Sequence, residues 1–146
     1  DQIRPLDVVQ SLPDLGKRWS DVSLTYLDPP YWRQSLNKYS QDAEDLANMS
    51  LEDFTDNLVK VVQGIGKKQS KGVIALLISP TMYAGVEDKP TADHVADLVC
   101  AVNLDLKVRI SCPYSTEQYN STQVEWAKEN KQLLCLTREL IIWSCT

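Results

Sequence analysis

Residues 22–32 have the sequence VSLTYLDPPYW, and the way this stretch stops decides the fold. The part from Val22 to Leu27 is rich in β-branched, aromatic and aliphatic side chains, which is typical of a short strand. Asp28 follows, and after it come two prolines, Pro29 and Pro30. Because proline cannot donate a hydrogen bond to a strand ladder, the strand must end here and the chain must turn.

A helix and a second strand are predicted downstream of this turn. Ser50 is a helix-capping residue. The apolar residues that follow it recur at helical spacing: Leu51, Phe54, Leu58, Val61, Val62 and Ile65. Gly64 and Gly66 predict the end of this helix. At the end of this helix, the lysines Lys67, Lys68 and Lys71 are predicted to be exposed to solvent. The run from Val73 to Ser79 is almost entirely apolar, which is typical of a strand buried on both faces in a parallel sheet. Strand, helix and strand together indicate a βαβ unit.

The rest of the chain continues the alternation of helices and strands. A second helix is predicted from its cap at Thr91 to Val102, with His94 as a surface or capping residue in its first turn. Alternating apolar and polar residues over 106–111 predict a strand with one solvated face. A polar stretch then leads to residues 133–143, predicted as one long strand or a tight hairpin. The fold class is α/β, in a single domain spanning residues 1–146.

The composition is that of an ordinary folded domain. The 146 residues are 43% hydrophobic and 24% charged, which excludes collagen-like and disordered chains. The net charge of −5 argues against coating of nucleic acid, although an enzyme can still meet DNA with one local face. The four cysteines have no C-x-x-C spacing, which argues against a zinc site or a redox dithiol. We expect reduced thiols, with two disulfides as the alternative, because a core of this size needs no covalent staple. The first residue is Asp1 rather than Met, as expected for a piece of a longer protein.

The turn after the first strand is also the candidate site. Ligands of doubly wound sheets bind at the carboxyl ends of the strands, where Asp28 and Pro29 lie. A carboxylate, a proline carbonyl and the ring of Tyr31 suit a planar ring that bears an exocyclic amine. The two oxygens accept hydrogen bonds from the amine, and the tyrosine stacks on the ring. A turn without function is the alternative, because proline pairs commonly stop strands.

The chain resembles a known family at this point. Asp28-Pro29-Pro30-Tyr31 is similar to the catalytic D-P-P-Y motif of DNA amino-methyltransferases, which act on the exocyclic nitrogen of adenine or cytosine. The resemblance continues through the loop Lys38-Tyr39-Ser40, the helix from Leu51 and the strand that ends at Pro80. It includes the segment from Pro113 to Asn120 and the run from Trp126 to Lys131, which are similar to a DNA modification methylase subgroup. It extends from about Leu6 to Trp143.

The resemblance implies a fold, a reaction and a set of roles. The fold would be part of a Rossmann-like class I methyltransferase sheet, mainly parallel, with an antiparallel C-terminal strand or hairpin. The reaction would transfer a methyl group from S-adenosylmethionine to a base flipped out of DNA, as in restriction–modification. Asp28 and the carbonyl of Pro29 would hold the target amine, with Pro30 completing the catalytic turn and Tyr31 stacking on the base. Asp28 would also border the cofactor pocket. A cytoplasmic protein of prokaryotic or phage type is implied.

Further residues are candidates for binding the substrate. Trp32 would extend the stacking wall, and Arg33 and Lys38 would contact the DNA backbone. Aromatic and amide side chains further along suit stacking and base-edge contacts, although a polar surface excursion is an equal alternative. The remaining substrate-binding candidates are Tyr39, Tyr114, Tyr119 and Asn120.

The chain departs from the family in one important respect. The glycine-rich F-x-G-x-G cofactor loop is absent, and Gly64-Ile65-Gly66 is predicted to stop a helix instead of following a strand. We therefore expect a catalytic portion whose cofactor-binding half lies elsewhere, in cis or in trans. The alternatives are a non-catalytic methyltransferase-like scaffold or binding domain, and methylation of a non-DNA amine in RNA or in a protein glutamine.

Overall fold

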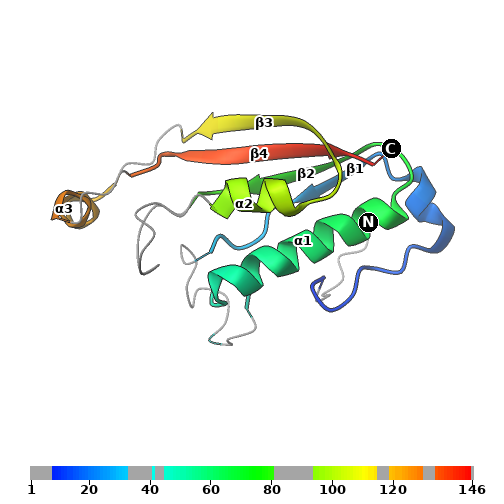
Figure 1. Cartoon of the computed structure of the whole chain (residues 1–146), viewed down its shortest axis with the longest axis horizontal. Coiled ribbons are helices and arrows are strands. Elements are labelled where there is room, and N and C mark those ends of the chain that lie inside the picture. The colour runs from blue at the N-terminus through cyan, green and yellow to red at the C-terminus, as the bar shows by residue number, and fades with distance from the viewer. Residues whose placement is uncertain are drawn as a thin grey trace.

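The computed structural model describes residues 8–32, 41, 45–80, 94–114, 119–129 and 134–145. Helices and strands alternate along these segments (Figure 1). In chain order they are the 3-10 helix η1 (Gly16–Asp21), β1 (Leu24–Leu27), α1 (Leu51–Lys68), β2 (Val73–Ile78), α2 (His94–Ala101), β3 (Asp105–Pro113), α3 (Ser121–Glu129) and β4 (Thr137–Ser144).

The four strands form one sheet in the order β1-β2-β4-β3. β1 and β2 are parallel and are joined through α1, so the predicted βαβ unit is confirmed. β4 lies between β2 and β3 and is antiparallel to both. The α/β class is therefore confirmed and residues 137–144 form a single strand, but the sheet is mixed and not mainly parallel. The reason is that the chain returns after α3 and inserts β4 between two strands that run the other way.

The first helix begins as predicted and ends later. The backbone N–H of Asp53 donates to Oγ of Ser50 over 3.1 Å, and this hydroxyl donates to the carboxylate of Asp53 over 2.7 Å. The helix passes through both glycines to Lys68, so the predicted stop at Gly64 and Gly66 is wrong. A Cβ at Gly66 would lie 2.9 Å from Cδ2 of Leu104. The glycine is there because a neighbouring side chain packs against the helix backbone.

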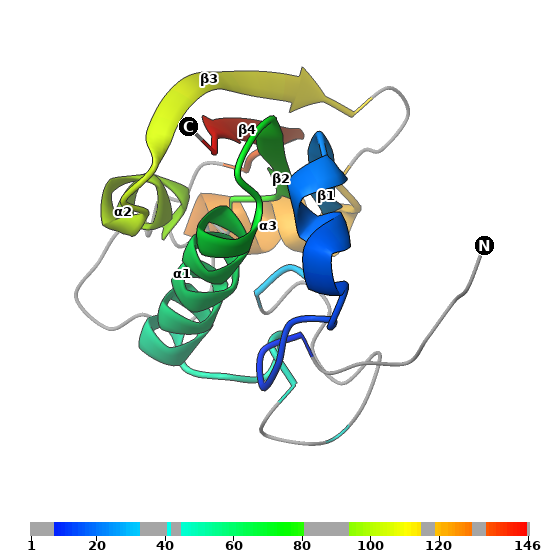
Figure 2. The ribbon, with the colours of Figure 1, turned by 90° about the vertical axis from the view of Figure 1, so that its right-hand side faces the viewer.

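The hydrophobic core lies between the sheet and the helices α1 and α2. Figure 2 shows both helices on the same side of the sheet. Strand residues that alternate along β2 and β4 point toward them and are fully buried, among them Ile74, Leu76 and Ile141. Trp19 and Trp143 belong to this core.

His94 is a core residue, and its predicted surface position is wrong. Its side chain is 0% exposed. Its ring makes edge-to-face contacts with Trp32, at 5.9 Å between centroids, and with Phe54, at 5.7 Å. His94 shares a helical stripe with buried Leu98, and this i, i+4 spacing is the sequence signal for burial.

The opposite face of the sheet is apolar but open. In the described part of the chain no helix covers this face (Figures 1 and 2). Leu24 and Tyr26 of β1 and Val108 and Ile110 of β3 are all exposed, by 39% to 58%. Leu106 points to the helix side and is exposed as well, so β3 has two solvated faces where the alternation predicts one. The cause is its place at the edge of the sheet, beyond the reach of the helices.

Candidate functional site

The D-P-P-Y turn lies at the carboxyl end of β1. Asp28 follows the last strand residue, Leu27, which pairs with Leu76 of β2. The hydroxyl of Tyr31 donates a hydrogen bond to Oδ1 of Asp28 over 3.0 Å. The phenol therefore fixes the carboxylate, and the remaining lone pairs of Asp28 stay available to a further donor.

The environment of Tyr31 keeps its hydroxyl protonated. Burial is the largest cause that raises the pKa of this phenol, and the hydrogen bond with Asp28 and the charge of Asp28 add to it. The positive charge of Arg138 acts in the opposite direction. Tyr31 therefore keeps its proton above the ordinary tyrosine pKa of 10.0 and donates it to the hydrogen bond with Asp28.

Tyr114 and Arg138 lie at the same end of the sheet. Tyr114 follows the last residue of β3, and its backbone N–H donates to the carbonyl of Leu136 over 3.0 Å. Arg138 pairs with Cys112 across the β3–β4 ladder. Its guanidinium lies over the ring of Tyr114, 4.6 Å from the centroid. Both side chains also influence the pKa of Tyr31 electrostatically, so they share one site with the D-P-P-Y turn.

Sequence reasoning identifies Tyr114 as a site residue and misses Arg138. Arg138 is part of a strand and stands in no recognisable motif. Its position beside Asp28 and Tyr31 follows only from the insertion of β4 beside β2. No local pattern in the sequence carries that signal.

Trp32 lies in the core and not in the open site. Its side chain is 2% exposed, and its indole N–H donates to the carbonyl of Met49 over 3.0 Å. A ring enclosed in this way has no free face for a base, so the predicted extension of the stacking wall is wrong. Three further candidates, Arg33, Lys38 and Tyr39, lie outside the described residues.

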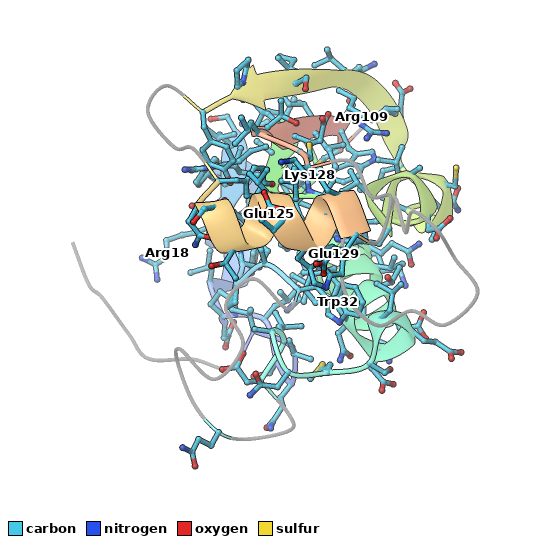
Figure 3. The ribbon with its side chains drawn as sticks, turned by 90° about the vertical axis from the view of Figure 1, so that its left-hand side faces the viewer. Arg18, Trp32, Arg109, Glu125, Lys128 and Glu129 are labelled. Carbon is cyan, nitrogen blue, oxygen red and sulfur yellow. The ribbon has the colours of Figure 1, made fainter. Side chains whose placement is uncertain are left out.

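Tyr119 and Asn120 lie at the start of α3, a helix that the polar sequence did not predict. The hydroxyl of Tyr119 donates to the carbonyl of Cys135, and the carbonyl of Asn120 accepts from the backbone N–H of Val124 over 3.1 Å. Both residues thus hold α3 in place. Figure 3 shows α3 across the end of the molecule, with Glu125 and Lys128 on it. These two side chains form an exposed ion pair of 3.0 Å.

A pocket of about 220 Å³ lies beside the turn. Its lining is mostly apolar and carries one charged side chain, that of Asp28. The lining residues are Val8, Tyr26, Leu27, Asp28, Pro29, Pro30, Leu46, Leu58 and Val61. S-adenosylmethionine bears an ammonium group, a carboxylate, a ribose and an adenine, and small-molecule sites usually measure about 300–1,000 Å³. The pocket beside Asp28 alone therefore does not fit the whole cofactor.

The arrangement is a set of hydrogen-bond acceptors flanked by aromatic rings. Asp28 and the carbonyl of Pro29 can accept from an amine, and Tyr31 and Tyr114 offer aromatic faces at the same strand ends.

Comparison of the chain with protein-family models, curated proteins and solved structures finds no match. None of the helices in the described ranges has the length and apolar character needed to cross a membrane.

Proposed function

We propose that this chain is the catalytic portion of a DNA methyltransferase that acts on the exocyclic amine of adenine or cytosine. The observation that carries the proposal is the Asp28 carboxylate, held by the Tyr31 hydroxyl at 3.0 Å at the carboxyl end of β1. A fixed acceptor beside aromatic faces is suited to a planar base with an amino group.

The residues of the chain orient the amine. Asp28 accepts one hydrogen of the amino group, and the carbonyl of Pro29 accepts the other, which directs the nitrogen lone pair away from both oxygens. Tyr31 stacks on the flipped base and repays part of the cost of unstacking it, while Tyr114 borders the same site with one face of its ring covered by Arg138. Asp28 also stabilises the positive charge that develops on the nitrogen. The catalytic contribution is positioning and electrostatics, without a covalent enzyme intermediate.

A class I methyltransferase fold is part of the same proposal. The parallel β1–β2 pair with its crossover helix and an antiparallel last strand are the features that the class I methyltransferase resemblance implies. The methyl donor, S-adenosylmethionine, requires a portion that supplies the glycine-rich loop, because the pocket beside Asp28 takes only part of such a ligand. We place that portion in the same longer chain or in a partner subunit.

The test is methyl transfer by the full-length protein with Asp28 replaced. Asp28→Ala is expected to lower incorporation of labelled methyl from S-adenosylmethionine into unmethylated genomic DNA by roughly 10²–10³-fold. Chromatography of the digested DNA identifies methyladenine or methylcytosine as the product. The matched control is Asp105→Asn, since Asp105 is an exposed carboxylate at the other end of the sheet.

The outcomes separate the proposal from its alternatives. Full activity of Asp28→Ala, with an unchanged circular-dichroism spectrum, would refute the role of Asp28. Absence of incorporation into any DNA by the unmodified full-length protein, assayed together with any subunit that co-purifies with it, would favour the non-catalytic scaffold. Incorporation into RNA or protein alone would favour a different amine as the substrate.

A further inference from the structure

Among the described residues, Arg138 differs from its cationic neighbours in having no carboxylate partner. Arg109 of β3 forms an ion pair with Glu139 at 3.1 Å, and Lys107 is paired with Asp105. Within the described segments, Arg138 makes no ion pair, and its Nε is buried without a hydrogen-bond partner. Its guanidinium is held over the ring of Tyr114. A hydrogen bond with Tyr114 is the largest cause that raises the pKa of Arg138.

Under the proposed function, the guanidinium of Arg138 lies at the end of the sheet that DNA must approach. Arg138 is the second residue of the central strand β4, at the end of the sheet where β1 and β3 terminate. It lies within electrostatic range of both Tyr31 and Asp28. The chain carries a net charge of −5, and the Asp28 carboxylate repels phosphate. A DNA strand that brings its base to Asp28 therefore needs a local cation.

We propose that Arg138 binds a backbone phosphate of the DNA strand whose base enters the Asp28 site, with Tyr114 holding the guanidinium in place. The inference rests on the proposed function and adds a contact that anchors the substrate. The guanidinium is planar by resonance, and stacking on an aromatic ring restricts the direction of its N–H fork, which suits bidentate binding of a phosphate. The contact carries no sequence information, so Arg138 contributes to affinity for all DNA sequences alike.

The experiment measures the salt dependence of DNA binding by the full-length protein. The probe is a fluorescein-labelled duplex with one mismatched base pair, because a mismatched base is easier to flip. Its dissociation constant is measured by anisotropy between about 50 and 200 mM salt. The variants are Arg138→Gln and Arg138→Lys. The matched control is Arg18→Gln, since Arg18 is exposed on η1, at the opposite end of the sheet, and points outward in Figure 3.

Arg138→Gln is expected to weaken binding roughly tenfold and to reduce the slope of log K against log salt by about one. Arg138→Lys keeps the charge and is expected to keep the slope. Thermal melts check that each variant is folded. A loss of affinity for S-adenosylmethionine in calorimetry, with DNA binding unchanged, would assign Arg138 to the cofactor carboxylate and overturn the proposal.

The remaining outcomes distinguish this inference from the proposed function. An unchanged slope in Arg138→Gln, or an equal change in Arg18→Gln, would overturn the phosphate contact while leaving Asp28-dependent methyl transfer intact. A full-length protein that binds no DNA and transfers no methyl group would overturn both.

Discussion

At the scale of single residues, Tyr31 acts on Asp28 before any substrate arrives. Its hydroxyl bonds to one carboxylate oxygen, and this bond orients the other. The same contact penalises the phenolate, because a negative oxygen beside Asp28 would be both repelled and poorly solvated. Tyr31 thus serves as a donor toward the carboxylate, and in the proposed function its ring also stacks on the base.

Titration of the tyrosines tests this account. The pKa of Tyr31 is raised above its ordinary value of 10.0, mainly by burial. In an ultraviolet titration near pH 10, folded Tyr31→Phe and folded wild type are therefore expected to gain the same phenolate absorbance. In urea, where both chains are unfolded, Tyr31→Phe is expected to gain one phenolate fewer than wild type.

The same shift has a consequence for stability. Because the raised pKa belongs to the folded state, the contribution of Tyr31 is complete below pH 10 and is lost as the pH rises further. Wild type should lose stability above pH 10 more steeply than Tyr31→Phe. A phenolate difference near pH 10 in the folded state would contradict the assignment.

At the scale of elements, the junction between α1 and the parallel strands depends on Gln69. This side chain is 0% exposed. Its Oε1 accepts from the hydroxyl of Thr25 over 2.7 Å, and its Nε2 donates to the carbonyls of Lys71 and Val73. Gly72 follows with φ of 84°, and a Cβ there would lie 2.1 Å from the carbonyl oxygen of Ser23. The helix thus enters β2 through one fixed turn.

Replacement of Gln69 by leucine should loosen this junction. Gln69→Leu leaves the Thr25 hydroxyl and the half-buried carbonyls of Lys71 and Val73 without this partner, so we expect a loss of about 1–3 kcal/mol in the free energy of unfolding. Urea denaturation measures it. The control is Gln63→Leu on the same helix, whose single bond to the carbonyl of Ala101 is accessible to water. Equal effects of the two changes would show that the network around Gln69 adds nothing.

At the scale of the whole molecule, the small pocket and the absence of a glycine-rich F-x-G-x-G loop from the sequence both indicate that the proposed cofactor site needs further residues. The pocket beside Asp28 has about 220 Å³ and a mostly apolar lining. A ligand as large and polar as S-adenosylmethionine needs more partners than Asp28 provides. Under the proposed function, binding of the cofactor therefore depends on residues other than those that line this pocket.

Calorimetry with the 146-residue chain tests this dependence. Titration of S-adenosylmethionine into the chain is expected to give no measurable heat or only weak binding, while the full-length protein binds it. A known S-adenosylmethionine-binding protein, titrated with the same solution, controls for the quality of the ligand. Micromolar binding by the 146-residue chain would contradict the division of the cofactor site.

Local patterns predict the elements nearest to the D-P-P-Y turn. The capping residue Ser50 and the apolar spacing after it predict α1, and the apolar run from Val73 predicts β2. Three predictions fail where the cause is not local. His94 is buried by contacts with Trp32 and Phe54 from other segments. The glycines of α1 are explained by Leu12 and Leu104. The polar sequence of α3 lacks a long apolar face.

The sequence by itself determined where β1 stops, because two prolines cannot continue a ladder, and it determined which residues form the turn at its end. Only the tertiary structure decided what faces that turn. The insertion of β4 between β2 and β3 brings Arg138 and Tyr114 into electrostatic range of Tyr31. Strand order depends on contacts between segments far apart in the chain, and their energies depend on the packing of the whole sheet and not on any local pattern.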